Sequence, residues 1–254
     1  MTGPRDHAAG PAATFVLVHG AWHGGWCYAR TAALLRARGH RVYAPTLSGL
    51  ADRSHLFSGA ITLSTHIADI VNLIKWEDLD DVVLCGHSYG GMVISGVAEQ
   101  VSDRIGSIVF LDAFIPEAGD CLFDIVPLPV ADFLADAGAN GGIGITPLSA
   151  GLFGVNEADR ARVDALCTLQ PIGTFTEKLP SVAGRERIAN KRYIFATGYA
   201  DGGLFKGFHA RVAQDAGWTT AIVDCGHDVM LDQPERLADL LEEAAPAEVA
   251  RSGD

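Results

Sequence analysis

The sequence lacks paired cysteines and has few basic residues. Its five cysteines are odd in number and widely spaced, and no two form a C-x-x-C pair, so neither a disulfide framework nor a zinc site is indicated. Lys and Arg number 19 against 31 Asp and Glu, and the net charge of −12 would repel nucleic-acid phosphates and anionic membrane surfaces. We therefore expect free thiols, no metal, and neither nucleic acid nor membrane as a partner.

Long apolar runs are also missing. No apolar stretch reaches membrane-spanning length, and the first 13 residues contain no apolar core of signal-peptide length. A cytoplasmic protein is therefore expected. G-x-G-x-x-G and the phosphate-binding loop are absent as well. The chain has 254 residues, of which 48% are hydrophobic and 20% charged, which suits one globular domain with a large core.

The most informative stretch is the apolar run Val82–Cys85, which breaks into Gly86-His87-Ser88-Tyr89-Gly90 and then continues with a helical pattern. G-x-S-x-G between a strand and a helix is the signature of a nucleophile elbow, a sharp turn that exposes a serine hydroxyl. Gly86 and Gly90 leave room for the strained backbone, because a Cβ at either position would collide with neighbouring chain. Ser88 is therefore the predicted nucleophile.

A second segment can supply hydrogen-bond donors for the oxyanion. The strand-like run Thr14–Val18 leads into a glycine-bearing loop, 19–26, and such a loop can present a backbone N–H to a neighbouring site. We expect the N–H groups of Ala21 and Tyr89 to form an oxyanion hole. Trp22 either lines the pocket mouth or packs the loop, and the sequence leaves both options open.

The predicted general base is His227, in a loop after the strand-like run Thr219–Val223. A histidine after the last strand, downstream of the serine, fits the chain order of serine hydrolases built on an α/β sheet. His19 and His87 are interpreted as structural residues. Asp228 follows His227 directly, but a carboxylate adjacent in sequence rarely reaches the ring Nδ1.

The rest of the chain alternates short β-rich runs with amphipathic segments, which predicts an α/β fold: a mostly parallel sheet of about six strands with helices on both faces. Thr65 is a plausible N-cap for the second helix. The predicted strands are 14–18, 41–44, 81–87, 105–111, 191–197 and 219–223, and the predicted helices are 28–38, 65–75, 90–101, 208–216 and 234–243.

This alternation stops between residues 113 and 190. The segment is rich in proline and glycine but also in large apolar side chains, so it is too apolar to be a solvated loop. We expect it to be a cap inserted in a core formed by 14–112 and 191–243, with flexible tails at 1–13 and 244–254. Phe123 and Phe153 of this cap, together with Trp22, are the candidate substrate-binding residues.

The strings HGAWHGGW, GHSYGGM and GHDVM resemble the α/β-hydrolase superfamily, and within it the compact branch of plant methylesterases, plant hydroxynitrile lyases and many bacterial carboxylesterases. The resemblance covers the chain from about Thr14 to Glu243. It implies hydrolysis of carboxylic esters through an acyl-enzyme, without a cofactor. Small aryl or alkyl esters, or a lactone, are the expected substrates, and a homodimer is one assembly the chain could form.

The resemblance leaves the third member of the triad open. Plant esterases of this branch carry an aspartate two residues after the threonine that corresponds to Thr197, but here that position holds Tyr199. Asp201 could substitute if the loop bends back. Asp112, at the end of the strand Ile105–Leu111, is the other candidate and the favoured one, since a buried carboxylate needs a partner such as a histidine Nδ1–H.

Two alternatives from other functional classes remain at this stage. A lyase acting on cyanohydrins would reuse the same triad, but plant hydroxynitrile lyases place a lysine directly after the histidine, where this chain has Asp228. A negative charge there would oppose cyanide. The second alternative is a non-catalytic receptor for a small ligand on the same fold.

Overall fold

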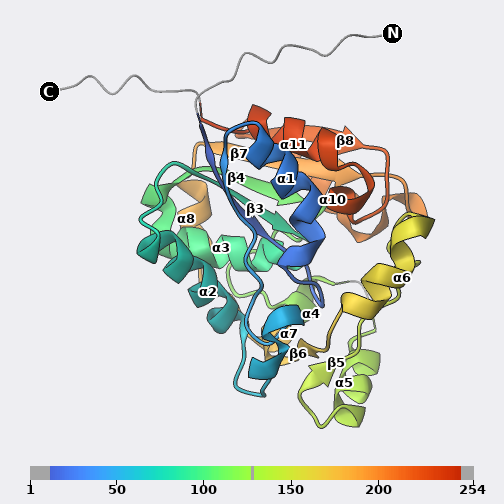
Figure 1. Cartoon of the computed structure of the whole chain (residues 1–254). Coiled ribbons are helices and arrows are strands. Elements are labelled where there is room, and N and C mark those ends of the chain that lie inside the picture. Colours follow the sequence, from blue (N-terminus) through green and yellow to red (C-terminus); the bar gives the residue numbers. More distant parts are fainter. Residues whose placement is uncertain (1–11, 127–128, 247–254) are drawn as a thin grey trace, which may run out of the picture.

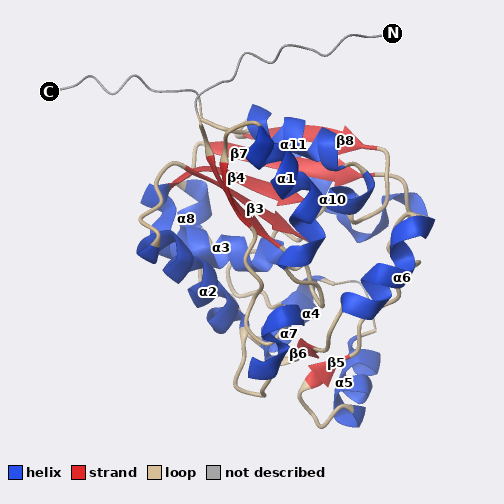
Figure 2. Cartoon of the chain, in the orientation of Figure 1, coloured by secondary structure: helices blue, strands red, loops and turns tan. Residues whose placement is uncertain are grey.

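The computed structural model describes residues 12–126 and 129–246, with the backbone alone for residues 200–202. At its centre is a six-stranded sheet in the order β2-β1-β3-β4-β7-β8, and all its neighbouring strands run parallel (Figures 1 and 2). The prediction of a mostly parallel sheet of about six strands is confirmed. The strands are β1 (Thr14–Val18), β2 (Arg41–Tyr43), β3 (Val82–His87), β4 (Ile105–Leu111), β7 (Asn190–Ala196) and β8 (Trp218–Val223).

Helices cover both faces of this sheet. Because successive side chains of a strand point to opposite faces, Leu84 joins the apolar cluster on one face, while Val83 and Cys85 join the cluster on the other. All six residues of β3 are buried, as expected for a strand covered on both sides. One cluster includes residues of α2 (Leu63–Trp76), α3 (Gly90–Val101) and α9 (Lys206–Val212), and the other includes residues of α1 (Ala29–Ala37), α10 (Val229–Asp232) and α11 (Pro234–Glu243).

Some predicted element boundaries were wrong. Thr62, not Thr65, is the N-cap of α2, and the Thr65 hydroxyl accepts the Thr62 N–H at 3.2 Å. The threonine chosen from the sequence is thus the third helical residue of a capping box. Helix α9 ends at Val212 instead of Ala216, because the chain turns at Asp215, whose carboxylate accepts the Gly217 N–H. The structure also contains two 3-10 helices that were not predicted, η2 (Ala51–Leu56) and η4 (Ala200–Phe205), the second of which precedes α9.

The segment predicted as a cap contains short helices and a small antiparallel sheet, β5–β6, which the sequence did not reveal. Most of it lies together at one end of the molecule, whereas α8 packs against α3 (Figure 1). The Trp22 N–H donates to Gln170 Oε1, so this segment contacts the loop after β1. Its elements are α4 (Leu122–Ile125), α5 (Val130–Ala139), β5 (Gly144–Ile145), α6 (Glu157–Leu166), β6 (Gln170–Pro171), α7 (Gly173–Thr176) and α8 (Ala183–Glu186).

The predicted C-terminal tail begins too early. Ala244 and Ala245 pack against the core, and the Ser107 hydroxyl donates to the Ala244 carbonyl. The remainder of that tail, 247–254, and residues 1–11 of the N-terminal tail lie outside the described residues. All five cysteines are free thiols. Among the described helices, none combines the length and the apolar character needed to cross a membrane.

Candidate active site

Ser88 lies in a strained turn between β3 and α3. Its φ is +53°, a left-handed conformation that a serine rarely adopts without surrounding support. The Ser88 N–H donates to the Leu111 carbonyl at 3.2 Å. A Cβ on Gly86 would lie 2.6 Å from the Gly90 oxygen, and one on Gly90 would lie 2.8 Å from the Val18 oxygen. The two glycines are thus required for this turn, as the sequence indicated.

His227 and Asp112 meet beside this turn although 115 residues separate them. The His227 Nδ1–H donates to Asp112 Oδ2 at 2.7 Å, and both side chains are buried. Asp112 follows β4 with a φ of +42°, and its other oxygen accepts the Ala196 N–H at 3.1 Å. Since Nδ1 carries the proton in this tautomer, Nε2 of His227 is the ring nitrogen that can accept one.

Hydrogen bonds to its backbone hold the His227 loop against the turn at Ser88 and against Phe153. His87 Nε2–H donates to the His227 carbonyl at 3.1 Å, and the two rings lie 4.3 Å apart. Burial, followed by the nearby His227, holds the pKa of His87 well below its usual value, so His87 is a neutral donor. The His227 N–H donates to the Phe153 carbonyl at 2.8 Å. This agrees with the structural interpretation of His87.

His19 orients the peptide group that carries the Ala21 N–H. Its Nδ1–H donates to the Gly20 carbonyl at 2.8 Å, while Nε2 accepts the Leu47 N–H at 3.0 Å. In a trans peptide the N–H points opposite to the carbonyl, so the Ala21 N–H points away from His19. A Cβ on Gly20 would lie only 3.0 Å from the Ser88 Cβ, which places this peptide beside Ser88. Burial lowers the pKa of His19 to about 3, which keeps the ring neutral.

Tyr89 contributes its backbone to this region, whereas its side chain is buried. The Tyr89 hydroxyl donates to His66 Nδ1 at 3.0 Å, and His66 Nε2–H donates to the Ser48 carbonyl at 2.9 Å. Tyr89 directly precedes α3, so its N–H is one of the free donors at a helix N-terminus.

Sequence reasoning missed Tyr199. Its hydroxyl donates to Asp112 Oδ2 at 2.6 Å and lies 3.3 Å from His227 Nδ1. The only sequence signal was its position, where the resembling plant enzymes carry an aspartate. The side chain of Asp201, the alternative acid, lies outside the described part of the chain.

A buried ion pair between His23 and Asp228 was also missed. His23 Nε2–H donates to Asp228 Oδ2 at 3.2 Å, and Nδ1–H donates to the Ala21 carbonyl at 2.8 Å, so both ring nitrogens are donors and the ring is an imidazolium. Burial alone would lower the pKa of His23, but the Asp228 charge and hydrogen bond raise it well above its usual value. The same pairing with His23, against burial, holds the pKa of Asp228 far below its usual value.

This pair corrects one sequence argument. The carboxylate of Asp228 is fully buried and compensated by His23, so it is not the exposed negative charge that we expected to oppose cyanide. The absence of a lysine after His227 remains as the sequence feature that separates this chain from the lyases.

Of the three candidate substrate-binding side chains, Phe153 contacts the ring of His227. The ring of Phe153 lies 5.3 Å from the His227 ring and 6.2 Å from the Trp22 ring. Trp22 is buried, and its Nε1–H donates to the Ile145 carbonyl, so it packs the loop after β1 against the cap segment. Phe123 stacks with Phe133 and contacts Phe175, which in turn contacts Trp22.

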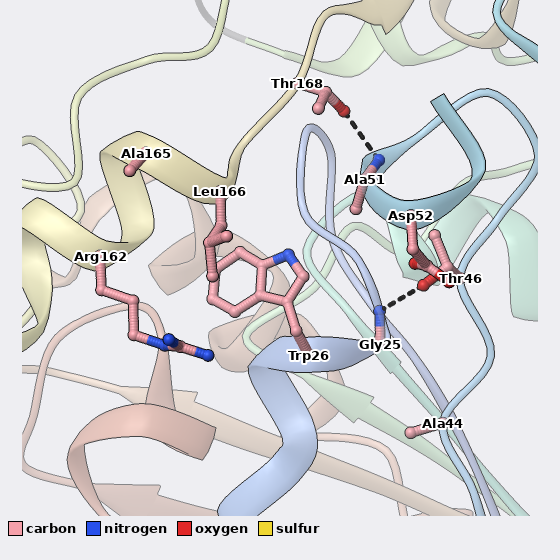
Figure 3. Close-up of a pocket in the computed structure, with 10 residues that line it drawn as sticks. All are labelled: Gly25, Trp26, Ala44, Thr46, Ala51, Asp52, Arg162, Ala165, Leu166 and Thr168. Carbon is pink, nitrogen blue, oxygen red and sulfur yellow. Dashed lines mark hydrogen bonds between the residues drawn. The ribbon is translucent and has the colours of Figure 1, made fainter. Parts of the chain in front are cut away.

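A separate surface pocket lies between η2 and α6 (Figure 3). The indole of Trp26 lines it, and the hydroxyls of Thr46 and Thr168 already accept backbone N–H groups of Gly25 and Ala51. None of the predicted site residues lines it. Within the described residues, no cluster of three or more His, Cys, Asp or Glu side chains could hold a metal ion.

Comparison with known proteins identifies the family. Residues 15–240 match the model of the alpha/beta hydrolase family. The chain is 44% identical over 238 residues to the "Carbendazim hydrolyzing esterase" of Nocardioides sp. (strain SG-4G), covering 90% of this chain and 98% of that protein. It is 39% identical over 106 residues to Methylesterase 2 of Arabidopsis thaliana, covering 41% of this chain and 40% of that one.

A solved structure agrees over nearly the whole chain. An extracellular alpha/beta-hydrolase from a Paenibacillus species, described as sharing structural and functional homology with tobacco salicylic acid binding protein 2, superposes with a TM-score of 0.81 at 29% identity. The match covers 92% of this chain and all of that one. The chain therefore belongs to the alpha/beta hydrolase family.

Proposed function

We propose that this chain is a serine esterase in which Ser88, His227 and Asp112 form the catalytic triad. Its relatives support ester hydrolysis, and the chain is a carboxylesterase-type hydrolase. One observation carries the assignment of roles: the 2.7 Å hydrogen bond from His227 Nδ1 to the buried Asp112, next to a serine held at a φ of +53°. This arrangement leaves Nε2 of His227 as the base for the serine proton.

In the proposed reaction, Ser88 Oγ attacks the ester carbonyl carbon while His227 Nε2 takes the hydroxyl proton. The negative charge that develops on the carbonyl oxygen is stabilised by the N–H groups of Ala21 and Tyr89. The alcohol leaves with the proton from His227. His227 then deprotonates a water that attacks the acyl-enzyme, which releases the carboxylic acid and restores Ser88.

The proposed substrates are esters with a small aryl or alkyl group. The ring of Phe153 lies beside His227 and is backed by the buried Trp22, and an aromatic surface of this kind suits a flat or apolar substrate group better than a sugar or a peptide. The relative from Nocardioides is named for the hydrolysis of carbendazim, which makes carbendazim a substrate to test here.

The experiment compares the purified protein with its Ser88→Ala variant on four compounds: p-nitrophenyl acetate, p-nitrophenyl butyrate, carbendazim and mandelonitrile. We expect the wild type to hydrolyse at least one of the first three, and the variant to lose that activity by several orders of magnitude. Cyanide release from mandelonitrile without ester hydrolysis would favour the lyase, and turnover of none would favour a receptor. An equally active Ser88→Ala variant would refute the assignment of the nucleophile.

A further inference from the structure

Tyr199 and His227 share one oxygen of Asp112. The Tyr199 hydroxyl donates to Oδ2 at 2.6 Å, the His227 Nδ1–H donates to the same atom at 2.7 Å, and Oδ1 accepts the Ala196 N–H at 3.1 Å. We propose that Tyr199 is a positioning residue that fixes the orientation of the Asp112 carboxylate and the proton on His227 Nδ1. This inference rests on the proposed esterase function.

The tyrosine ring occupies a slot built by two glycines from separate segments. Gly203 and Gly154 have φ values of +57° and +67°. A Cβ on Gly203 would lie 2.5 Å from Cε2 of Tyr199, and one on Gly154 would lie 2.7 Å from its Cβ. Any larger residue at either glycine would push the ring away, so the backbone on both sides is adapted to this position of the hydroxyl.

The hydroxyl has a defined effect on a fully buried carboxylate. Desolvation of Asp112 is offset by three donors, of which Tyr199 is one. By withdrawing charge from Oδ2, the phenol makes this oxygen a weaker proton acceptor, so the proton stays on His227 Nδ1 when the imidazolium forms. Without the hydroxyl, the carboxylate loses one of the hydrogen bonds that fix its rotation. The negative charge on Oδ2 then interacts more strongly with His227.

Tyr199 acts as a donor throughout the working pH range. Burial, followed by the Asp112 charge, raises the pKa of its phenol well above the usual value. Around the network, burial raises the pKa of Tyr193 and raises that of Cys225 to about 12, whereas burial lowers the pKa of His87 and of His209, and the pKa of Asp228 is far below its usual value. These shifts keep the charge of each of these groups constant between about pH 7 and 9.

The test is the Tyr199→Phe variant, which removes the oxygen and keeps the ring. Tyr43→Phe is the matched control, because the Tyr43 hydroxyl also donates to a carboxylate, Glu77 Oε2 at 2.8 Å, but on the surface. Using p-nitrophenyl butyrate between pH 5 and 9, we expect Tyr199→Phe to lower kcat by about 10- to 100-fold, as for loss of a hydrogen bond to a charged group. We expect KM to change by less than about twofold, because the hydroxyl acts through Asp112 and not on bound substrate.

Three further readouts separate positioning from simple packing. The pH at which kcat/KM is half-maximal should rise in Tyr199→Phe, since a carboxylate with more charge on Oδ2 favours the imidazolium, and it should stay unchanged in Tyr43→Phe. Adding Tyr199→Phe to Asp112→Asn should cause little additional loss, because both changes act on the same group. The downfield proton resonance of the His227–Asp112 bond should also move in Tyr199→Phe, and this readout needs no substrate.

The outcomes show separately whether the inference about Tyr199 fails or the proposed esterase function fails. If Tyr199→Phe keeps the wild-type kcat, pH profile and proton resonance while Ser88→Ala is inactive, the inference about Tyr199 is wrong and the esterase assignment stands. If Tyr199→Phe lowers kcat but leaves the pH profile and the proton resonance unchanged, Tyr199 is only a packing residue, and the inference is also wrong. If the wild type hydrolyses no ester, the proposed function fails first.

Discussion

His23 and Asp228 form a buried ion pair that joins the two loops on which the proposed chemistry depends. The pair is 3.2 Å long, and its side chains are only 3% and 0% exposed. His23 lies two residues after Ala21 and bonds to the Ala21 carbonyl, while Asp228 directly follows His227. The pair therefore fixes the loop that carries the proposed oxyanion donor, Ala21, relative to the loop that carries the proposed general base, His227.

Asp228→Asn should be strongly destabilising, because it leaves an imidazolium buried without its counter-ion. We expect the free energy of unfolding at pH 7 to fall by about 3–5 kcal/mol. The matched control is Asp239→Asn, which breaks an ion pair with Arg38 in which Asp239 is 42% exposed and should cost less than about 1 kcal/mol. Urea denaturation measures both, and similar losses in the two variants would show that the buried pair has no special role.

Stability should fall as the pH is lowered, because two buried histidines resist protonation. Burial lowers the pKa of His19 to about 3 and that of His66 to about 4, whereas the unfolded chain titrates near 6.5. Between pH 6.5 and 4 the unfolded state thus binds protons that the folded state does not. Each histidine should cost roughly 2 kcal/mol between pH 7 and 5.

His66→Gln tests this pH dependence at one residue. Glutamine can donate to the Ser48 carbonyl and accept from the Tyr89 hydroxyl, as His66 does, but it does not titrate. The difference in unfolding free energy between pH 7 and 5 should therefore shrink by roughly 2 kcal/mol, whatever the variant's absolute stability. An unchanged difference would mean that His66 is not the group that takes up the proton.

Asp112→Asn should lower kcat by as much as about 10⁴-fold with little change in KM, because the amide can donate to His227 Nδ1 and thereby favour the wrong tautomer. Asp201→Asn, measured beside it, should remain near wild type. A large loss in Asp201→Asn together with normal turnover in Asp112→Asn would transfer the role of the acid to the other loop.

Phe153→Ala should change substrate preference more than the rate on the smallest ester. The Phe153 ring lies 5.3 Å from the His227 ring, and its loss should lower kcat/KM for p-nitrophenyl butyrate about tenfold relative to the acetate, within the range of about 1–3 kcal/mol per methylene. Phe123→Ala, whose ring is linked to Phe153 through Phe175 and Trp22, should have a smaller effect in the same direction. Equal losses on both esters would indicate that these rings support the scaffold.

The parts of the site that could be predicted from sequence are those encoded locally. Gly86 and Gly90 fix the turn around Ser88, and the glycine-bearing loop after β1 shows where the Ala21 N–H must lie. Chain order alone made His227 the candidate base, and that role stays a prediction. The core strands were predictable for a similar reason, since each is a short buried run with its own pattern.

The remaining features depend on contacts between distant residues. His23 and Asp228 are 205 residues apart and Tyr199 and Asp112 are 87 apart, so no spacing in the sequence links them. Their pairing follows only from the order of parallel strands, which brings the loops after β1, β4, β7 and β8 to one edge of the sheet. Helix ends were misplaced where two equivalent residues compete for a cap, as Thr62 and Thr65 do.

Covalent labelling of Ser88 tests the central claim most directly. The wild type and Ser88→Ala are each incubated with a serine-directed fluorophosphonate, and the modified residue is identified by mass spectrometry of the peptides. Wild-type protein should gain one phosphonyl group, located on Ser88, and lose its esterase activity in proportion, while Ser88→Ala should remain unlabelled. Labelling at another residue, or full activity after complete labelling of Ser88, would contradict a Ser88-based esterase.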